Sequence, residues 1–205
     1  MNRDDGAVRV FVAIDLPEPA KETLRQAVAD LQGDLQQGIR WVRPEGIHLT
    51  LKFLGDVSSA RVGDIQEAME RAAREFEPAC FRLALSGLGV FPNPREPRVL
   101  WAGVSGDMEA LEHLQGLTDG CLEDAGFARE RRPFRPHLTL GRVRDQVAPA
   151  ERRRIGQAIQ QASPPGGVDW QVGEIHLIRS TPTPGGAIYD SIGRATLMGQ
   201  GGPAV

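Results

Sequence analysis

The tetrapeptide His-Leu-Thr-Leu occurs twice in this sequence, at residues 48–51 and again at residues 137–140. The chain contains four histidines, so half of them stand in the same local context in the two halves of the chain. A proline precedes each copy, Pro44 in the first half and Pro136 in the second. Internal repeats indicate that one structural unit has been used twice. The repeat therefore predicts a fold of two similar halves, each carrying one copy of the motif.

The apolar pattern predicts alternating strands and helices along both halves. Period-two alternation predicts strands at residues 8–14, 47–54, 81–85, 99–104, 137–143, 172–178 and 188–198. Helical spacing of apolar residues predicts helices that include residues 24–35, 62–69, 111–122 and 155–159. Gly55 is expected to end the second strand, and Ser58 to cap the helix that follows it. This order predicts a mixed sheet covered by helices, in one domain over residues 1–205, with a flexible tail at residues 199–205.

Composition and charge exclude several classes of protein. The apolar fraction of 40% and the charged fraction of 25% are typical of globular chains. A net charge of −3 argues against a protein that coats long nucleic acids, although it leaves room for a site that binds one nucleotide end. The apolar runs are shorter than the about 20 residues of a membrane span, and no signal-peptide pattern is present. Cys80 and Cys121 lack disulfide or metal spacing, so we expect a cytoplasmic protein.

The geometry of a strand gives the repeated motif its chemical interest. Residues two apart share a face, so His48 and Thr50 point one way while the leucines of the motif point the other way; the same holds for His137 and Thr139. If the two halves pack around a pseudo-twofold axis, both histidine–threonine pairs meet across one cleft. One neutral histidine then accepts a proton while a protonated one donates a proton, and the threonine hydroxyls donate to phosphate oxygens. We expect no metal, because neither motif histidine has a second ligand at zinc-like spacing.

Arg142 follows His137 by five residues and supplies positive charge for the same phosphate. Strict alternation places this arginine on the leucine face of its strand. Gly141 stands between the motif and the arginine, and a glycine allows a twist or a bulge at this point. The position of Arg142 is therefore the part of the site that the alternation does not determine.

The sequence resembles the 2H phosphoesterase superfamily, in particular the bacterial and archaeal RNA 2′,3′-cyclic phosphodiesterases, also called 2′-5′ RNA ligases. The resemblance covers nearly the whole chain and includes the flanks of both motifs. The matching segments are residues 10–17, 41–42, 44–45, 48–55, 97–104 and 133–140, with Gly186 and Tyr189 in the last hairpin. It implies a bilobal α+β fold in which mixed or antiparallel sheets of two pseudo-symmetric halves line a central cleft, with helices outside.

The resemblance also implies an activity and residue roles. Such enzymes hydrolyse a terminal 2′,3′-cyclic phosphate on RNA to a 2′-phosphate, without a metal, another cofactor or ATP. His48 is then the proton donor and His137 the proton acceptor, a choice that the symmetric sequence alone does not make. Thr50, Thr139 and Arg142 are then the phosphate ligands. The reverse reaction, in which a 5′-hydroxyl attacks the cyclic phosphate, gives a 2′-5′ linkage.

Four further residues are candidates for contacts with the RNA. Arg132 and Arg135 lie in a basic segment just before His137, which is either a solvated charge run or an electrostatic funnel for an RNA end. Phe11 and Phe134 are candidates for stacking a terminal base, and core packing is the alternative for both rings.

Two other functions remain open at this stage. One is a related 2H activity on a small cyclic nucleotide or on an ADP-ribose-type cyclic phosphate. The other is a module that binds RNA ends without chemistry. The expected partners are RNA 3′ ends with a 2′,3′-cyclic phosphate, tRNA fragments among them. We expect no membrane and no obligate protein partner, so a monomer is sufficient.

Overall fold

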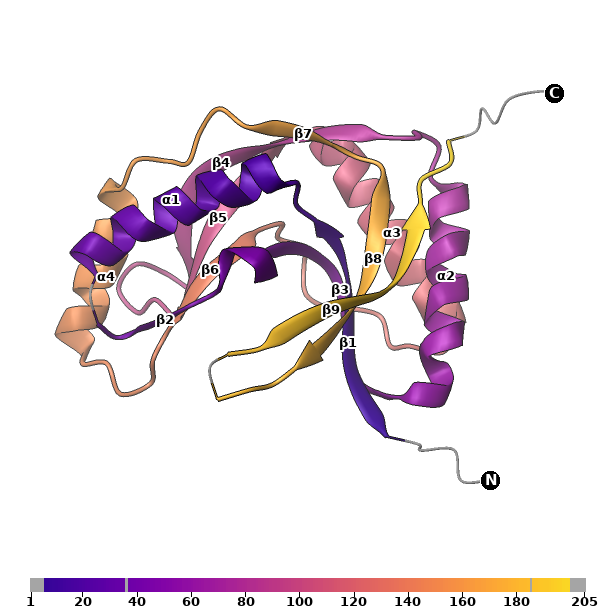
Figure 1. Ribbon diagram of the computed structural model, residues 1–205, viewed down its shortest axis with the longest axis horizontal. Helices are drawn as coiled ribbons and strands as arrows, with labels where there is room; N and C mark the ends of the chain where they lie inside the picture. Colours follow the sequence, from indigo (N-terminus) through magenta and orange to yellow (C-terminus); the bar gives the residue numbers. More distant parts are fainter. Residues whose placement is uncertain (1–5, 36, 185, 200–205) are drawn as a thin grey trace.

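The computed structural model describes residues 6–35, 37–184 and 186–199, which form four α-helices, two short 3₁₀ helices and nine strands (Figure 1). The strands are β1 (Ala7–Asp15), β2 (Ile39–Trp41), β3 (His48–Ser58), β4 (Phe81–Phe91), β5 (Val99–Gly106), β6 (Leu138–Val143), β7 (Asp169–Val172), β8 (Glu174–Thr181) and β9 (Ile188–Thr196). The helices are α1 (Glu18–Asp34), η1 (Pro44–Gly46), η2 (Ser59–Arg61), α2 (Val62–Glu75), α3 (Met108–Asp124) and α4 (Pro149–Gln161). None of the helices within the described residues is long and apolar enough to cross a membrane.

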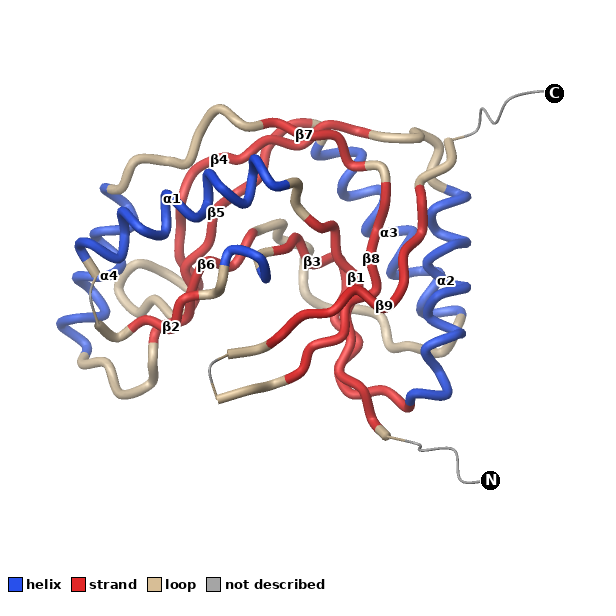
Figure 2. Tube along the Cα trace, in the orientation of Figure 1, coloured by secondary structure: helices blue, strands red, loops and turns tan. Residues whose placement is uncertain are grey.

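All the described strands belong to one sheet, in the order β7-β4-β5-β6-β3-β1-β8-β9, with β2 added beside β6. Every pairing is antiparallel. The sheet curls into an arch, with α1 and α4 over one arm and α2 and α3 over the other (Figure 2). The predicted α+β class with outer helices is confirmed, and a single continuous antiparallel sheet passes through both halves of the chain.

The first helix illustrates how the sequence produces an element and attaches it to the sheet. α1 has Glu18 and a proline in its first turn, where a backbone N–H has no helical partner and negative charge is favourable. Its buried residues follow helical spacing and form one stripe: Ala20, Leu24, Val28 and Leu31. The stripe packs against the large core cluster that also contains the sheet leucines.

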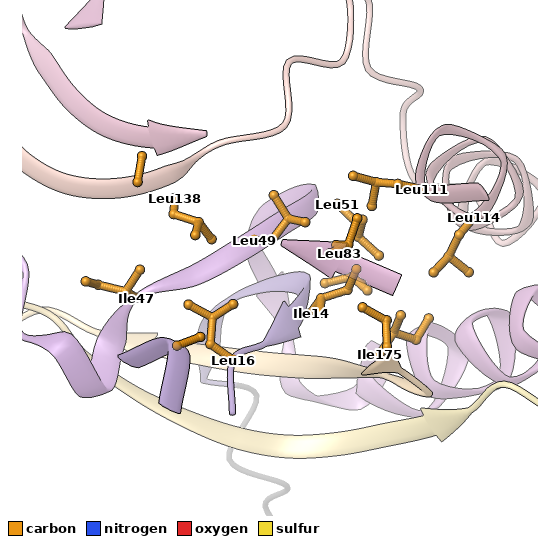
Figure 3. Close-up of a cluster of buried hydrophobic side chains, with 14 of the residues drawn as sticks. Ile14, Leu16, Ile47, Leu49, Leu51, Leu83, Leu111, Leu114, Leu138 and Ile175 are labelled. Carbon is orange, nitrogen blue, oxygen red and sulfur yellow. The ribbon is translucent and has the colours of Figure 1, made fainter. Parts of the chain in front are cut away.

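The main core lies between the sheet and its helices. Figure 3 shows leucines and isoleucines from β1, β3, β6 and β8 meeting leucines of α3, among them Leu49, Leu138 and Leu111. These three side chains are fully buried, and such burial is worth about 1.5–3 kcal/mol for each leucine. The second leucines of the two repeated motifs lie in the same cluster. The repeat therefore contributes one of its two faces to the core, and the other face is free for a site.

Of two short strands, β2 is absent from the elements that the sequence predicts, and β7 is predicted only at its last residue, Val172. With three and four residues they show too little alternation to be recognised, and they owe their conformation to pairing with β6 and β4. The predicted strand over residues 172–178 is divided at Gly173 between β7 and β8.

The end of β3 also differs from the prediction. Gly55 adopts a φ of 74°, and the strand continues to Ser58 instead of ending at the glycine. The Ser58 hydroxyl accepts a hydrogen bond from the Ala60 N–H at 3.3 Å, so this serine caps η2, which leads directly into α2. Of the predicted flexible tail at residues 199–205, residues 200–205 lie outside the described residues.

Candidate active site

The two motif strands lie next to each other in the middle of the sheet. β3 and β6 run antiparallel, with Leu49 opposite Leu138. Leu51 and Leu140, the second leucines of the two copies, are also buried. All four leucines therefore point toward the helices, and the Leu49–Leu138 pair marks the centre around which the two copies are related.

The histidines and threonines of the motif occupy the opposite face, which we call the histidine face. His48, Thr50, His137 and Thr139 are each half-buried rather than sealed in the core. In an antiparallel register centred on the two leucines, His48 lies across from Thr139 and His137 lies across from Thr50. The fold thus brings together the two histidine–threonine pairs that are far apart in the sequence.

A β-bulge in the second motif determines the position of Arg142. Leu100 and Trp101 of β5 pair with the residues on either side of Leu140, so Leu140 is an extra residue in its strand. The bulge shifts the alternation by one residue and places Arg142 on the histidine face, not on the leucine face that strict alternation predicts. The charge of Arg142 also acts on the pKa of His137, as expected for neighbouring groups.

The first motif contains a bulge at the equivalent place. Val12 and Ala13 of β1 pair with the residues on either side of Leu51, so this leucine is the extra residue of β3. The shift turns Lys52 toward the core, where it is only 3% exposed, and turns Phe53 onto the histidine face. Both copies of the motif therefore share an irregularity of the backbone as well as four residues of sequence.

Phe53 is a residue of this site that the sequence analysis did not single out. Its side chain is 62% exposed, and its ring centroid lies 5.7 Å from that of Phe11 on the neighbouring strand. Phe53 follows its histidine by five residues, as Arg142 does in the second half. This equal spacing is the signal in the sequence that points to Phe53.

The His48 ring is held by its backbone and by two aromatic rings. Its Nδ1 lies 2.8 Å from the Gly46 carbonyl oxygen, which only accepts hydrogen bonds, so Nδ1 is the protonated nitrogen. Phe11 stacks on the imidazole with a centroid distance of 4.4 Å, and Tyr189 meets it edge-on at 5.0 Å. These contacts leave Nε2 without a hydrogen-bond partner in the described part of the chain.

His137 repeats this arrangement with different neighbours. Its Nδ1 donates to the Arg135 carbonyl oxygen at 2.7 Å, again two residues earlier in the chain. Phe91 contacts the ring edge-on at a centroid distance of 5.0 Å. Nε2 of His137 likewise has no hydrogen-bond partner among residues 6–35, 37–184 and 186–199. Both histidines therefore use Nδ1 to hold the ring, and within these residues the Nε2 atom has the same unbonded state in each.

Both imidazoles favour the neutral form when no anion is bound. Burial lowers the pKa of His48 to about 4, although the hydrogen bond to Gly46 and the charge of Asp15 act in the opposite direction. Burial also lowers the pKa of His137, and the positive charge of Arg142 acts in the same direction. At neutral pH each ring is thus an Nδ1–H tautomer with a free lone pair on Nε2.

A glycine permits the close approach of Tyr189 to the first histidine. A Cβ atom on Gly46 would lie 2.8 Å from Cδ2 of the tyrosine ring, which is closer than real Cβ contacts allow. Gly46 therefore places its carbonyl under His48 and leaves space for the tyrosine at the same time.

Comparison with known sequences identifies the family of the chain. Residues 14–101 and 105–189 match the family described as LigT like Phosphoesterase. The chain belongs to this family. A protein of Methanothermobacter thermautotrophicus named RNA 2′,3′-cyclic phosphodiesterase is 37% identical over 185 residues, which cover 89% of this chain and 95% of the relative. A Thermus thermophilus protein of the same name is 33% identical over 202 residues, which cover 95% and 93%.

Solved structures of the phosphoesterase family share the fold. A structure from Thermus thermophilus superposes with a TM-score of 0.73 at 30% identity, covering 94% of this chain and 99% of the other. Escherichia coli LigT in complex with 3′-AMP superposes with a TM-score of 0.68 at 26% identity over the same shares. The 3′-AMP in that complex is bound to the Escherichia coli protein.

The structure places the predicted RNA-contact residues of this phosphoesterase in different settings. Phe11 is 3% exposed and packs on His48, so its ring supports the histidine and has no free face for a base. Phe134 is half-buried against the main core. Arg132 is held by Glu130 through both its Nε and Nη2 atoms, whereas the Arg135 side chain is exposed.

A buried ion pair supports the segment that leads to the second histidine. Lys52 forms an ion pair with Asp119 of α3 and donates to the Ala128 carbonyl oxygen at 2.6 Å. Asp119 also accepts a hydrogen bond from the Glu130 backbone N–H at 3.3 Å. The bulge at Leu51 thus has a second consequence, since it turns a lysine inward to anchor the chain ahead of His137.

Proposed function

We propose that this phosphoesterase adds water to the 2′,3′-cyclic phosphate at the 3′ end of an RNA and leaves a 2′-phosphate. The observation that carries the proposal is the pairing of two Nδ1-anchored histidines across the centre of the sheet, with an arginine turned to the same face by a bulge. This arrangement provides two proton-transfer groups and a cation for one phosphate. The names of the relatives support the choice of a cyclic phosphate on RNA.

The reaction has one bond-forming and one bond-breaking event. His137 Nε2 takes a proton from a water molecule as the water oxygen attacks phosphorus. The bond from phosphorus to O3′ breaks, and His48 Nε2 donates a proton to the departing oxygen. Thr50, Thr139 and Arg142 hold the non-bridging oxygens, whose negative charge grows in the transition state. The sum is the addition of one water molecule.

The division of roles between the two histidines follows the resemblance to the 2H phosphoesterases. Burial lowers the pKa of both free histidines, and the charge of Asp15 only partly opposes this at His48, so each ring is neutral before substrate binds. The charge of the bound phosphodiester raises the pKa of both rings, so the proton that His48 must carry is stabilised when substrate is present.

Phe53 supports a nucleotide as the group attached to the cyclic phosphate. An exposed aromatic ring on the histidine face offers a stacking surface for a base, and such stacking is worth about 1–3 kcal/mol. We assign the base contact to Phe53 in place of Phe11.

The proposal extends to the RNA substrates, the cell compartment and the oligomeric state of the protein. We infer that RNA 3′ ends such as tRNA fragments are the substrates and that the protein acts in the cytoplasm as a monomer. The exposed free thiol of Cys80 and the free Cys121 support a reducing compartment. A size measurement in solution tests the monomer.

The deciding experiment uses a short RNA that ends in a 2′,3′-cyclic phosphate, incubated with the protein in EDTA and without ATP. We expect a mass gain of one water and a 2′-phosphate product, with no product from His48→Ala or His137→Ala. Tight RNA binding without product would point to a binding module. Activity confined to small cyclic phosphates would point to a different substrate class, and loss of activity in EDTA would contradict a metal-free mechanism.

A further inference from the structure

A cavity of about 550 Å³ adjoins the proposed catalytic centre, and of its lining residues only Arg142 takes part in the chemistry described above. One wall comes from β2 and η1, and the other comes from the end of the β8–β9 hairpin. This hairpin reaches toward β2 (Figure 1). Gly46 and Tyr189 line the cavity, and both of them contact His48. The cavity is therefore separated from a catalytic ring by a single layer of residues.

The lining of this cavity is strongly basic. Arg9, Arg40, Arg43 and Arg142 all border it, and all four side chains are exposed. Within the described residues, none of these guanidinium groups has a hydrogen bond or an ion pair. Many arginines elsewhere on the surface are paired with carboxylates. The chain as a whole has a net charge of −3, so this concentration of unpaired positive charge is a local feature.

The acidic residue in the lining, Glu45, is bonded from outside the cavity. Its Oε1 accepts a hydrogen bond at 3.2 Å from Nη2 of Arg25, an α1 residue that also pairs with Glu18 and Glu22. One carboxylate therefore faces four arginines, and the lining keeps an excess of positive charge for an anion. The planar donor groups of the arginines suit phosphate oxygens, which they bind in a bidentate manner. Trp41 and Ile188 add an apolar wall against which a sugar or a base can pack.

We propose that this cavity binds the phosphodiester that joins the terminal nucleotide of the substrate to the nucleotide before it. The inference rests on the proposed function. An RNA that ends in a 2′,3′-cyclic phosphate has no phosphate beyond that group, so any further phosphate of the substrate lies on its 5′ side. Arg142 borders both the cavity and the catalytic face, and it links the two phosphate positions. Arg9, Arg40 and Arg43 serve the inner phosphodiester alone.

The proposal defines the substrate class more narrowly than the catalytic centre does. A nucleoside 2′,3′-cyclic phosphate fills the catalytic centre and leaves the basic cavity empty. An oligonucleotide fills both, so its kcat/KM is expected to be the higher. The enzyme is then built for the ends of RNA chains and not for free cyclic nucleotides.

The test compares two substrates with the same terminal base, a trinucleotide with a 2′,3′-cyclic phosphate end and the matching nucleoside 2′,3′-cyclic phosphate. Arg40→Ala and Arg43→Ala are each expected to lower kcat/KM for the trinucleotide by about tenfold relative to the nucleotide, because each removes a charge-assisted contact. The salt dependence of the trinucleotide reaction should weaken by about 0.7 in log–log slope for each phosphate contact removed. Arg153→Ala, an exposed arginine of α4 outside the cavity, is the matched control.

The outcomes separate this inference from the proposed function. Hydrolysis of the nucleotide by each variant shows that the protein is folded and that the catalytic centre works. An unchanged ratio between the two substrates in both variants overturns the proposed subsite, even if both substrates are hydrolysed. If that ratio is unchanged but joining to a 5′-hydroxyl RNA falls, the cavity holds the attacking strand, and the assignment to the 5′ side is wrong. If the wild type hydrolyses neither substrate, the proposed function itself fails.

Discussion

The two motif strands, β3 and β6, begin alike and then differ. In both, the histidine donates its Nδ1–H to a carbonyl oxygen two residues earlier, and in both the second leucine forms a bulge. After the bulge the strands diverge. Lys52 in the first half corresponds to Gly141 in the second, and Phe53 corresponds to Arg142. The backbone of the site is thus nearly symmetric, whereas its side chains are not.

Under the proposed function, this difference makes the reaction directional. The shared part offers two equivalent nitrogens to one phosphate. The unshared part places a cation beside His137 and an aromatic ring in the half that holds His48. We therefore expect the phosphate to lie toward one half and the base toward the other, which gives the substrate one preferred orientation. Variants of the shared residues should abolish the reaction, and variants of the unshared residues should alter its direction and strength.

The largest effect is expected from the shared histidines. His48→Ala and His137→Ala should each reduce kcat by about 10²–10⁴-fold, because each removes one proton-transfer group. The double variant should lose little more than either single variant, since the two groups act in one concerted step. Single-turnover rates on a cyclic-phosphate RNA measure all three. A double loss equal to the product of the single losses would contradict concerted action.

The second largest effect is expected from Arg142. Arg142→Ala should lower kcat by about 10²–10³-fold, because it removes one donor that stabilises the charge of the transition state. Arg142→Lys should recover only part of the rate, because an ammonium group does not reproduce the paired contacts of a guanidinium. Arg144→Ala, an exposed arginine just after β6, is the control. A rate near wild type for Arg142→Ala would show that Arg142, although the bulge turns it to the histidine face, does not bind the phosphate.

The placement of Arg142 also shows where prediction from the sequence stops. Alternation predicts the faces of the motif leucines, histidines and threonines, because adjacent side chains in a strand point to opposite faces. A bulge depends on which strand lies alongside, and that neighbour is distant in the sequence. Leu140 is an extra residue only with respect to β5, so no local pattern reveals it. The same limit hides Phe53, whose face changes at the bulge beside β1.

Tertiary contacts decide the role of Phe11 in a similar way. The alternating apolar residues of β1 predict a strand, and the structure contains it. They do not reveal that the ring lies on the histidine face and stacks on His48 from a neighbouring strand. The fold class and the motif faces were therefore accessible from the sequence, whereas the side chains that complete the site required the register of the sheet.

The next largest effect is expected from Phe53, the residue of the first half that corresponds to Arg142. Phe53→Ala should lower kcat/KM for RNA by about tenfold through loss of base stacking, mainly in KM, while Phe53→Trp should retain activity. Ile192→Ala, an exposed apolar residue of β9, controls for loss of surface hydrophobicity. Equal KM values for Phe53→Ala and the wild type would remove Phe53 from the binding site.

The smallest effect concerns the pH dependence of folding. Burial lowers the pKa of His48 from 6.5 to about 4, so between these values the unfolded chain binds more protons than the folded one. The free energy of unfolding therefore rises with pH across this window, by on the order of 1–2 kcal/mol between pH 5 and pH 7. His48→Gln cannot titrate and should lose this part of the pH dependence. Urea unfolding at both pH values measures the difference.

The same titration relates protonation to the site. His113→Gln, which replaces a histidine of α3 outside the site, is the matched control for the substitution. Added inorganic phosphate should reduce the pH dependence of the wild type, because a bound anion raises the pKa of His48 and stabilises its protonated form. An equal pH dependence in the wild type and His48→Gln would show that burial does not control this histidine. An effect of phosphate in wild type that is absent from Arg142→Ala would place the anion between the two halves, where their difference matters.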